Sequence, residues 1–445
     1  MMTIKSLEKT IPQLKELCQM EDVFWINPNK ETVAEANTKV KYSMKDIHDA
    51  SDRLERFAPF IKATFEDTVE TDGIIESFIT EIPEFKSYLE SFYDTKIQGN
   101  MYLKRDDSLP IAGTIKARGA IYEVLKHAET IAIEAGLLSG FDDDYTKFAS
   151  EEFREFFNGR QIVVGTTGNL GISVGTMARA LGFEVVIHMS VEAKEWKKEF
   201  LRSRGVKVVE HNTNFTEAVR QGRMESEANP ASYFVDDEHS VDLFMGYTVG
   251  GLRLKKQLAA AKIPVDSNHP LFVYLPCGIG GSPGGITFGL KQVFGDNVHC
   301  FFAEPAHMPS MLLGLMTQEY DNINVTDVNI DGKTVMDGLA VPQTSGFVAE
   351  LMEHYFDGGF TVSEHDSMHL LAKMHEIEDI QLEPAALAGT PGPSRLFQKA
   401  EGKQFLADLN IADHSNITHI AWATGGSMVP EADMQAFIQA GLETY

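Results

Sequence analysis

The sequence contains few cysteines and no long hydrophobic run, and these absences limit the classes of protein to which it can belong. Only three of the 445 residues are cysteine, namely Cys18, Cys277 and Cys300, and no pair has CxxC spacing. This excludes a disulfide framework and favours a reducing, cytoplasmic location. No stretch of about 18 apolar residues is present, and the mixed-charge N-terminus lacks the apolar core of a signal peptide. We therefore expect neither a membrane span nor export.

Basic residues are scarce relative to acidic ones. The chain has 39 Lys and Arg against 65 Asp and Glu, a formal net charge of -26. Such a charge opposes binding to nucleic acid or to an anionic membrane surface, so a small metabolite is the expected partner. The basic cluster in residues 191–205 is then interpreted as the solvated face of a helix.

Short apolar runs alternate with helical patterns from about residue 100 onward. The runs are mostly β-branched or aromatic and too continuous for one wet face, which predicts buried parallel strands covered by helices. The expected strands are 161–165, 183–189, 206–211, 232–237, 271–277, 298–304 and 419–425. Seven strands over this length indicate two α/β domains rather than one.

Lys116 lies at a turn of small residues just before an amphipathic helix. Ala117 and Val124 recur at helical spacing after it, and Thr114 is a candidate N-cap. The positive end of the helix dipole disfavours the protonated amine and favours its nucleophilic form. Lys116 is therefore a candidate for a Schiff base with a carbonyl cofactor, the alternative being a solvated surface lysine.

The strand at 161–165 is followed by a small-residue loop, 166–169, and then by a helix predicted to begin near Leu170. The first amides of a helix have no intrahelical acceptor and face the positive end of its dipole. We therefore expect this loop to bind a carboxylate.

A second glycine-rich turn, 278–282, also follows a buried strand and precedes a helix predicted to begin at Pro283, a residue suited to the first helical position. Its amides are candidates for a phosphate site. Two alternatives stay open, an ordinary turn and a dinucleotide site. Gly278 and Gly280 begin the dinucleotide fingerprint and Glu304 ends the next strand, but Pro283 replaces the third glycine. The alternative function is therefore an NAD(P)-dependent oxidoreductase that uses residues 278–285.

A third strand end carries Thr424, which precedes two glycines. Open α/β sheets bind ligands at the carboxyl ends of their strands, so the Thr424 hydroxyl is expected in the same cleft as the two turns. One lysine and three such strand ends form a set, and this favours a cofactor role for Lys116.

These segments resemble the signature of fold type II pyridoxal-phosphate enzymes, the group of threonine dehydratase, serine racemase and tryptophan synthase β. The resemblance is carried by KRD at 104–106, GTIK at 113–116 and RG at 118–119. More closely, TTGNLGISVG, YFVDDEHSVDLFMGY and YLPCGIGGSPGG resemble the bacterial D-serine dehydratases (D-serine ammonia-lyases), as does the long N-terminal extension. Two departures are Thr114, where serine is expected, and Ser282, in a loop that is usually all glycine. Ser282 restricts its backbone only if a positive φ is needed there.

The resemblance implies a tryptophan synthase β-like fold of two parallel-sheet α/β domains with a helical N-terminal extension. Residues 1–95 are expected to pack on the large domain as this extension. The large, cofactor-binding domain is expected at 96–115 and 240–445, and the small α/β domain at 116–239. A monomer is expected, because the extension covers surfaces that relatives use for dimer contacts.

The implied function is the pyridoxal 5'-phosphate-dependent β-elimination of D-serine to pyruvate and ammonia, with D-threonine to 2-oxobutanoate as a further reaction. The resemblance assigns a covalent link to Lys116, the ring hydroxyl to Asn169 and the ring nitrogen to Thr424. The residues assigned to the phosphate are Gly278, Ile279, Gly280, Gly281 and Ser282. The residues assigned to the substrate are Thr166, Thr167, Gly168 and Asp236.

Three roles follow from this assignment. A D-amino acid presents its α-hydrogen to the side opposite Lys116, so Thr166 or a water is the expected base. Asp236 and Asp237 have two open interpretations, orientation of the substrate hydroxyl or capping of the next helix. Glu304 stands where related enzymes bind a cation such as K⁺ or Na⁺, the alternative being a salt bridge at the edge of the core.

Overall fold

The computed structural model describes residues 11–166, 168–191, 193–212 and 215–444. The chain forms two compact units. Unit 1 comprises Met1–Met44, Ser77–Ser108 and Gly250–Tyr445, and unit 2 comprises Lys45–Glu76 and Leu109–Val249. None of the helices in the described part of the chain combines the length and the apolarity needed to cross a lipid bilayer.

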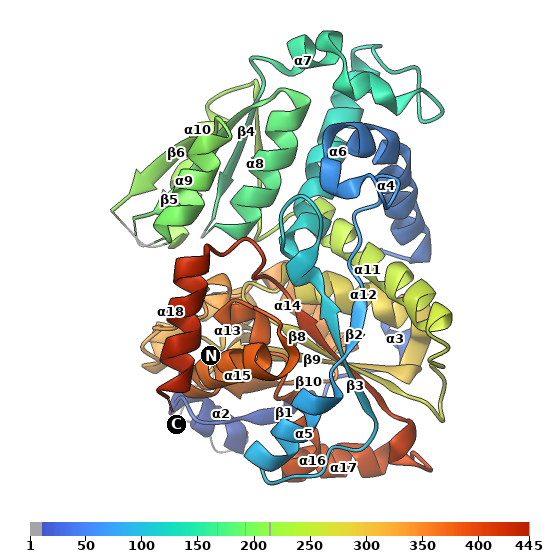
Figure 1. Ribbon diagram of the computed structural model, residues 1–445, viewed down its shortest axis with the longest axis vertical. Helices are drawn as coiled ribbons and strands as arrows, with labels where there is room; N and C mark the ends of the chain where they lie inside the picture. The colour runs from blue at the N-terminus through green and yellow to red at the C-terminus, as the bar shows by residue number, and fades with distance from the viewer. Residues whose placement is uncertain (1–10, 167, 192, 213–214, 445) are drawn as a thin grey trace. The chain divides into compact units, whose positions relative to one another are not determined.

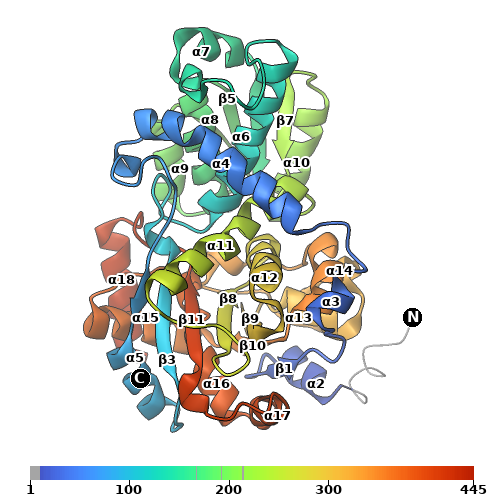
Figure 2. The ribbon, with the colours of Figure 1, turned by 90° about the vertical axis from the view of Figure 1, so that its right-hand side faces the viewer.

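Unit 1 is built on a seven-stranded sheet with the order β1-β10-β9-β8-β11-β3-β2. Figure 2 shows the central strands side by side. The strands are β1 (Phe24–Ile26), β2 (Ile79–Glu81), β3 (Asn100–Arg105), β8 (Leu271–Pro276), β9 (Val298–Pro305), β10 (Gly358–Val362) and β11 (Thr418–Ala423). The five central strands are parallel, and β1 and β2 close the edges antiparallel. Every residue of β8, β9, β10 and β11 is buried, as expected for strands covered on both faces.

Helices cover this sheet. They are α2 (Pro12–Cys18), α3 (Val33–Ala36), α5 (Pro83–Phe92), the later part of α11 (Val241–Ala260), α12 (Gly281–Phe294), α13 (Ser310–Thr317), α14 (Gly346–Tyr355), α15 (Glu364–Glu378), α16 (Gly392–Gln398), α17 (Ala400–Asp408) and α18 (Glu431–Leu442). One apolar cluster joins β3 and β11 to α5, α15 and α18. Another joins β1, β8, β9 and β10 to α16 and α17.

Unit 2 has a four-stranded parallel sheet with the order β6-β5-β4-β7. Its strands are β4 (Gln161–Gly165), β5 (Glu184–Ser190), β6 (Lys207–His211) and β7 (Ser232–Val235). Its helices are α4 (Met44–Thr64), α6 (Lys116–Glu134), α7 (Glu151–Phe157), α8 (Asn169–Leu181), α9 (Glu195–Ser203), α10 (Phe215–Glu227) and the start of α11. Helices α8 and α10 both pack on β4 and β5 (Figure 1).

The two-sheet α/β fold is confirmed, and each of the seven apolar runs contains a strand. Residues 1–95 were expected to pack on the large domain as one extension. In the structure the segment Lys45–Glu76 belongs to unit 2 instead. Arg53 Nε lies 2.6 Å from Glu129 Oε2, and Arg56 Nη2 lies 2.9 Å from Glu129 Oε1. These ion pairs fix α4 to α6. Residues 109–115 and 240–249 also belong to unit 2 rather than to the larger unit.

Candidate active site

Lys116 is the first residue of α6, so it belongs to the helix that the sequence predicts directly after it. The N-cap is Ile115, with no side-chain cap, and not Thr114. The Thr114 hydroxyl instead accepts a hydrogen bond from the Lys116 backbone N–H at 3.4 Å. The Lys116 side chain is 16% exposed, so it is not the solvated surface lysine of the alternative interpretation.

Among the residues that the structure describes, the Lys116 amine forms an ion pair with the Asp237 carboxylate. Lys116 Nζ lies 3.3 Å from Asp237 Oδ2 and 3.5 Å from Oδ1, and the Asp237 side chain is 13% exposed. Capping of the next helix, one of the two interpretations left open for Asp236 and Asp237, does not apply to either residue. The Ser240 hydroxyl caps this helix, α11, and accepts from the Leu243 N–H at 3.1 Å. Asp237 is therefore placed to orient the amine of Lys116 through this ion pair.

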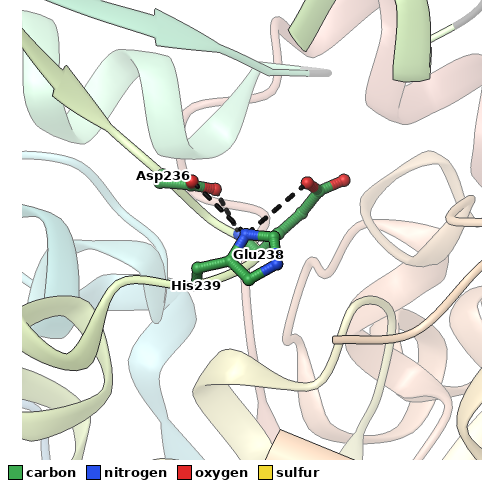
Figure 3. Close-up of side chains that lie close together, drawn as sticks. All are labelled: Asp236, Glu238 and His239. Atoms are coloured by element: carbon green, nitrogen blue, oxygen red, sulfur yellow. Dashed lines mark hydrogen bonds and ion pairs between the residues drawn. The ribbon is translucent and has the colours of Figure 1, made fainter. Parts of the chain in front are cut away.

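Asp236 points to a different set of partners. Arg223 Nη2 lies 3.0 Å from Asp236 Oδ2 and 2.9 Å from Glu238 Oε2. His239 Nδ1 lies 3.4 Å from Asp236 Oδ2 and 3.9 Å from Glu238 Oε2 (Figure 3). Asp236, Glu238 and His239 have donor atoms close enough for one metal ion. The Arg223 guanidinium already pairs with both carboxylates, so ion pairs within the protein explain the cluster.

The loop 166–169 joins β4 to α8. The Thr166 N–H donates to His188 O at 3.0 Å, and the Thr166 hydroxyl accepts from the Gly168 N–H at 3.0 Å. Gly168 is the N-cap of α8, with φ +146°. Helix α8 begins at Asn169. Its N-cap Gly168 supplies no side-chain cap bond and its first turn contains no acid, so this helix start suits a carboxylate. Thr167, also expected to bind substrate, lies outside the described residues.

Lys197 packs on this loop. A Cβ added to Gly168 would lie 2.3 Å from Lys197 Cδ, and the positive φ also favours glycine there. Lys197 and Lys198 are both buried, so the prediction of a solvated basic face is wrong for these two residues. Sequence reasoning missed them because their partners come from tertiary packing, as with Glu210, 2.8 Å from Lys198 Nζ.

In unit 1 the predicted phosphate turn leads from β8 into α12. Helix α12 begins at Gly281, so Pro283 is its third residue rather than its first. Gly280 has φ +110°, and a Cβ there would lie 2.3 Å from Met311 Cε. Ser282 does not have a positive φ, so its side chain is compatible with the turn. The first turn of α12 is buried and lacks an acid and a side-chain cap bond, which fits a phosphate group.

Thr424 directly follows the last residue of β11, two residues before the expected end of this strand, and is buried. Its turn packs against Glu383, a residue that no pattern in the sequence indicated. A Cβ on Gly425 would lie 2.4 Å from Glu383 Oε1, and the Glu383 N–H donates to Gly425 O at 3.1 Å.

Glu304 is the last residue but one of β9 and is fully buried. Its two carboxylate oxygens accept from the Met311 and Leu312 N–H groups, each at 2.8 Å, so Glu304 stabilises the start of α13. Burial raises its pKa to about 8, while the two backbone hydrogen bonds oppose this rise. Glu304 forms no ion pair with any residue that the structure describes. The alternative interpretation, a salt bridge at the edge of the core, therefore does not apply to these residues.

The predicted residues therefore fall into two groups. Unit 2 carries those of the lysine, the carboxylate loop and the aspartate pair: Lys116, Thr166, Gly168, Asn169, Asp236 and Asp237. Unit 1 carries those of the phosphate turn, the threonine turn and the buried acid: Gly278, Ile279, Gly280, Gly281, Ser282, Thr424 and Glu304.

Known proteins resemble this chain over nearly its whole length. Residues 88–405 match the family model described as pyridoxal-phosphate dependent enzyme. A probable D-serine dehydratase of Geobacillus stearothermophilus is 50% identical over 446 positions, covering 99% of this chain and 97% of that protein. A probable D-serine dehydratase of Vibrio cholerae is 51% identical over 443 positions, covering 99% of this chain and 100% of that protein.

Solved structures share the fold at low identity. Diaminopropionate ammonia lyase from Escherichia coli, in complex with D-serine, has a TM-score of 0.71 at 14% identity, covering 95% of this chain and 97% of that chain. A fungal L-serine ammonia-lyase from Rhizomucor miehei has a TM-score of 0.61 at 18% identity, covering 82% of this chain and 98% of that chain.

Proposed function

Since this chain belongs to the family of pyridoxal-phosphate dependent enzymes, we propose that it eliminates water from D-serine and releases pyruvate and ammonia. The observation that carries the proposal is the position of Lys116 at the start of α6, with its amine 3.3 Å from the Asp237 carboxylate. Relatives that share half of their residues with this chain are named probable D-serine dehydratases, which supports the choice of substrate. Membership of this family also favours the elimination reaction over the alternative function, that of an NAD(P)-dependent oxidoreductase.

The residues assigned from the sequence are proposed to hold the cofactor. Pyridoxal phosphate supplies an electron sink that acidifies the α-carbon of a bound amino acid and allows the β-hydroxyl to leave. Lys116 holds it covalently, and residues 278–282 bind its phosphate through the first amides of α12. Asn169 contacts the ring hydroxyl. Thr424 faces the ring nitrogen and, as a neutral hydroxyl, does not enforce protonation there.

The loop 166–169 is proposed to bind the substrate carboxylate at the start of α8, whose N-cap Gly168 supplies no side-chain cap bond. D-serine and L-serine present their α-hydrogens to opposite sides when their amino and carboxylate groups are held alike. Lys116 is therefore assigned the exchange of its own amine for the substrate amino group, and Thr166 or a bound water is assigned the removal of the α-proton. Asp237, rather than Asp236, is the carboxylate that orients Lys116, because Asp236 is paired with Arg223.

The first test is pyruvate release by the purified protein from D-serine and from L-serine, with visible absorbance recorded. We expect D-selective release and a violet-region cofactor band, both absent in Lys116→Ala. Lys126→Ala is the matched control, since this lysine of the same helix pairs with Asp242 instead. Selectivity for L-serine would contradict the proposed substrate, and an unchanged band in Lys116→Ala would contradict the proposed cofactor residue.

A further inference from the structure

Tyr247 is a fully buried tyrosine in the part of α11 that belongs to unit 2. Its hydroxyl has no hydrogen-bond partner among the residues that the structure describes. A buried hydroxyl without a partner is unfavourable, and native proteins retain few of them. The position of this hydroxyl therefore calls for an explanation.

The hydroxyl end of the Tyr247 ring lies against α6, one helical turn after Lys116. A Cβ added to Gly119 would lie 2.5 Å from Tyr247 Cε2 and 2.6 Å from Cζ, the atom that carries the hydroxyl. Burial raises the pKa of Tyr247 well above its usual value, and the negative charges of Asp237 and Glu123 raise it further. Both carboxylates therefore act on this hydroxyl.

These two carboxylates differ in how their oxygens are bonded. Glu123 accepts from the Tyr233 hydroxyl at 2.8 Å and from the Ser240 hydroxyl at 2.7 Å. Both donors are neutral hydroxyl groups, so their bonds to Glu123 do not depend on the charge or the bonding of Lys116. Asp237 is paired with the ammonium of Lys116, which is the group that changes its bonding when a carbonyl cofactor attaches. Asp237 then becomes a largely buried carboxylate that has lost its cation, an unfavourable state unless another donor replaces it.

We propose that Tyr247 is a positioning residue, whose hydroxyl donates to the Asp237 carboxylate in place of the Lys116 ammonium when Lys116 holds the cofactor. This inference rests on the proposed function, because it requires Lys116 to be the cofactor residue. The exchange of partners keeps Asp237 ionised and in place, ready to pair again with Lys116 when substrate releases the lysine. Tyr247 touches neither the substrate nor the cofactor in this role.

The test compares Tyr247→Phe with wild type, free of cofactor and loaded with pyridoxal 5'-phosphate. Phenylalanine keeps the ring packed on Gly119 and removes only the hydroxyl. We expect the unfolding temperature of the cofactor-free variant to equal or exceed that of wild type, because an unpaired hydroxyl is removed. We expect its affinity for the cofactor, measured by equilibrium dialysis, to fall by about 10-fold or more, as for the loss of a hydrogen bond to a charged group.

Tyr233→Phe is the matched control, since its hydroxyl bonds Glu123. It should lower the unfolding temperatures of both forms alike and leave the cofactor affinity unchanged. Equal cofactor affinity in Tyr247→Phe and wild type would overturn the inference, and an equal loss of stability in both forms would assign Tyr247 a structural role instead. Wild-type protein that binds the cofactor but releases no pyruvate from D-serine would refute the proposed function alone, and the affinity comparison would still decide the role of Tyr247.

Discussion

We expect the Glu304→Gln substitution to remove a pH dependence from the stability of unit 1. Burial raises the pKa of Glu304 to about 8, from a usual value of 4.5. Between these two values the folded chain keeps a proton that the unfolded chain has lost. The contribution of Glu304 is therefore fully present below pH 4.5 and is lost as the pH rises to about 8. At about 1.4 kcal/mol for each unit of pKa difference, the loss has an upper bound of about 5 kcal/mol.

Urea unfolding from pH 5 to pH 8.5, in buffers without Na⁺ or K⁺, measures this effect. The free energy of unfolding of wild type should fall relative to Glu304→Gln as the pH rises, by several kcal/mol across the window. Other titrating groups are common to both proteins and cancel in the difference. Glu199→Gln, at an exposed position of α9, should track wild type at every pH. Parallel curves for wild type and Glu304→Gln would refute the reasoning.

The same pair of proteins tests the cation expected at Glu304. A cation on this carboxylate favours its ionised form, so K⁺ should restore the stability of wild type above about pH 7 and leave Glu304→Gln unchanged. An equal effect of K⁺ on both proteins would place the cation elsewhere.

The remaining predictions concern the loop 166–169 and the core of unit 1. Thr166→Val should slow solvent exchange of the D-serine α-proton by about 100-fold or more, measured by NMR in D₂O, because the proposed base is lost. Thr176→Val, at a buried position of α8, is its control, and full exchange in Thr166→Val would exclude Thr166 as the base. Lys291→Met should lower the free energy of unfolding by about 3–5 kcal/mol, because it leaves the fully buried Asp357 carboxylate, 2.7 Å away, without this cation. A loss below about 1 kcal/mol in urea unfolding would show that Lys30 and His299 suffice for Asp357.

The central strands β4, β5, β8, β9 and β11 could be predicted from sequence because burial on both faces leaves a continuous apolar run. Strand β10 is also fully buried but was missed, because two glycines and a threonine leave it without such a run. Strands β1 and β2 could not be predicted, since each has only three residues and is defined by its pairing, β1 with β10 far along the chain and β2 with β3. Strand β3 was missed because it ends in two basic residues, of which Lys104 is fully buried beside Ser77.

The site divides in the same way. Lys116 and the two glycine-rich turns follow a local pattern of strand, turn and helix, so their positions could be predicted. The choice between Asp236 and Asp237 could not, because it depends on how the chain leaves β7 after Val235 and on α6 and α10, which supply Lys116 and Arg223. The orphan hydroxyl of Tyr247 has no signal in sequence, since only packing reveals that a donor lacks an acceptor.

The strand order of unit 1 has a consequence for the order of events on the ribosome. Strand β11 lies between β8 and β3, so the pair β2 and β3 has no link to the rest of the sheet until residues 418–423 have been made. All four strands of unit 2 precede residue 236. Unit 2 therefore completes its sheet while unit 1 still lacks β11, and a nascent chain that stops before Thr418 exposes two unpaired strand edges in the larger unit.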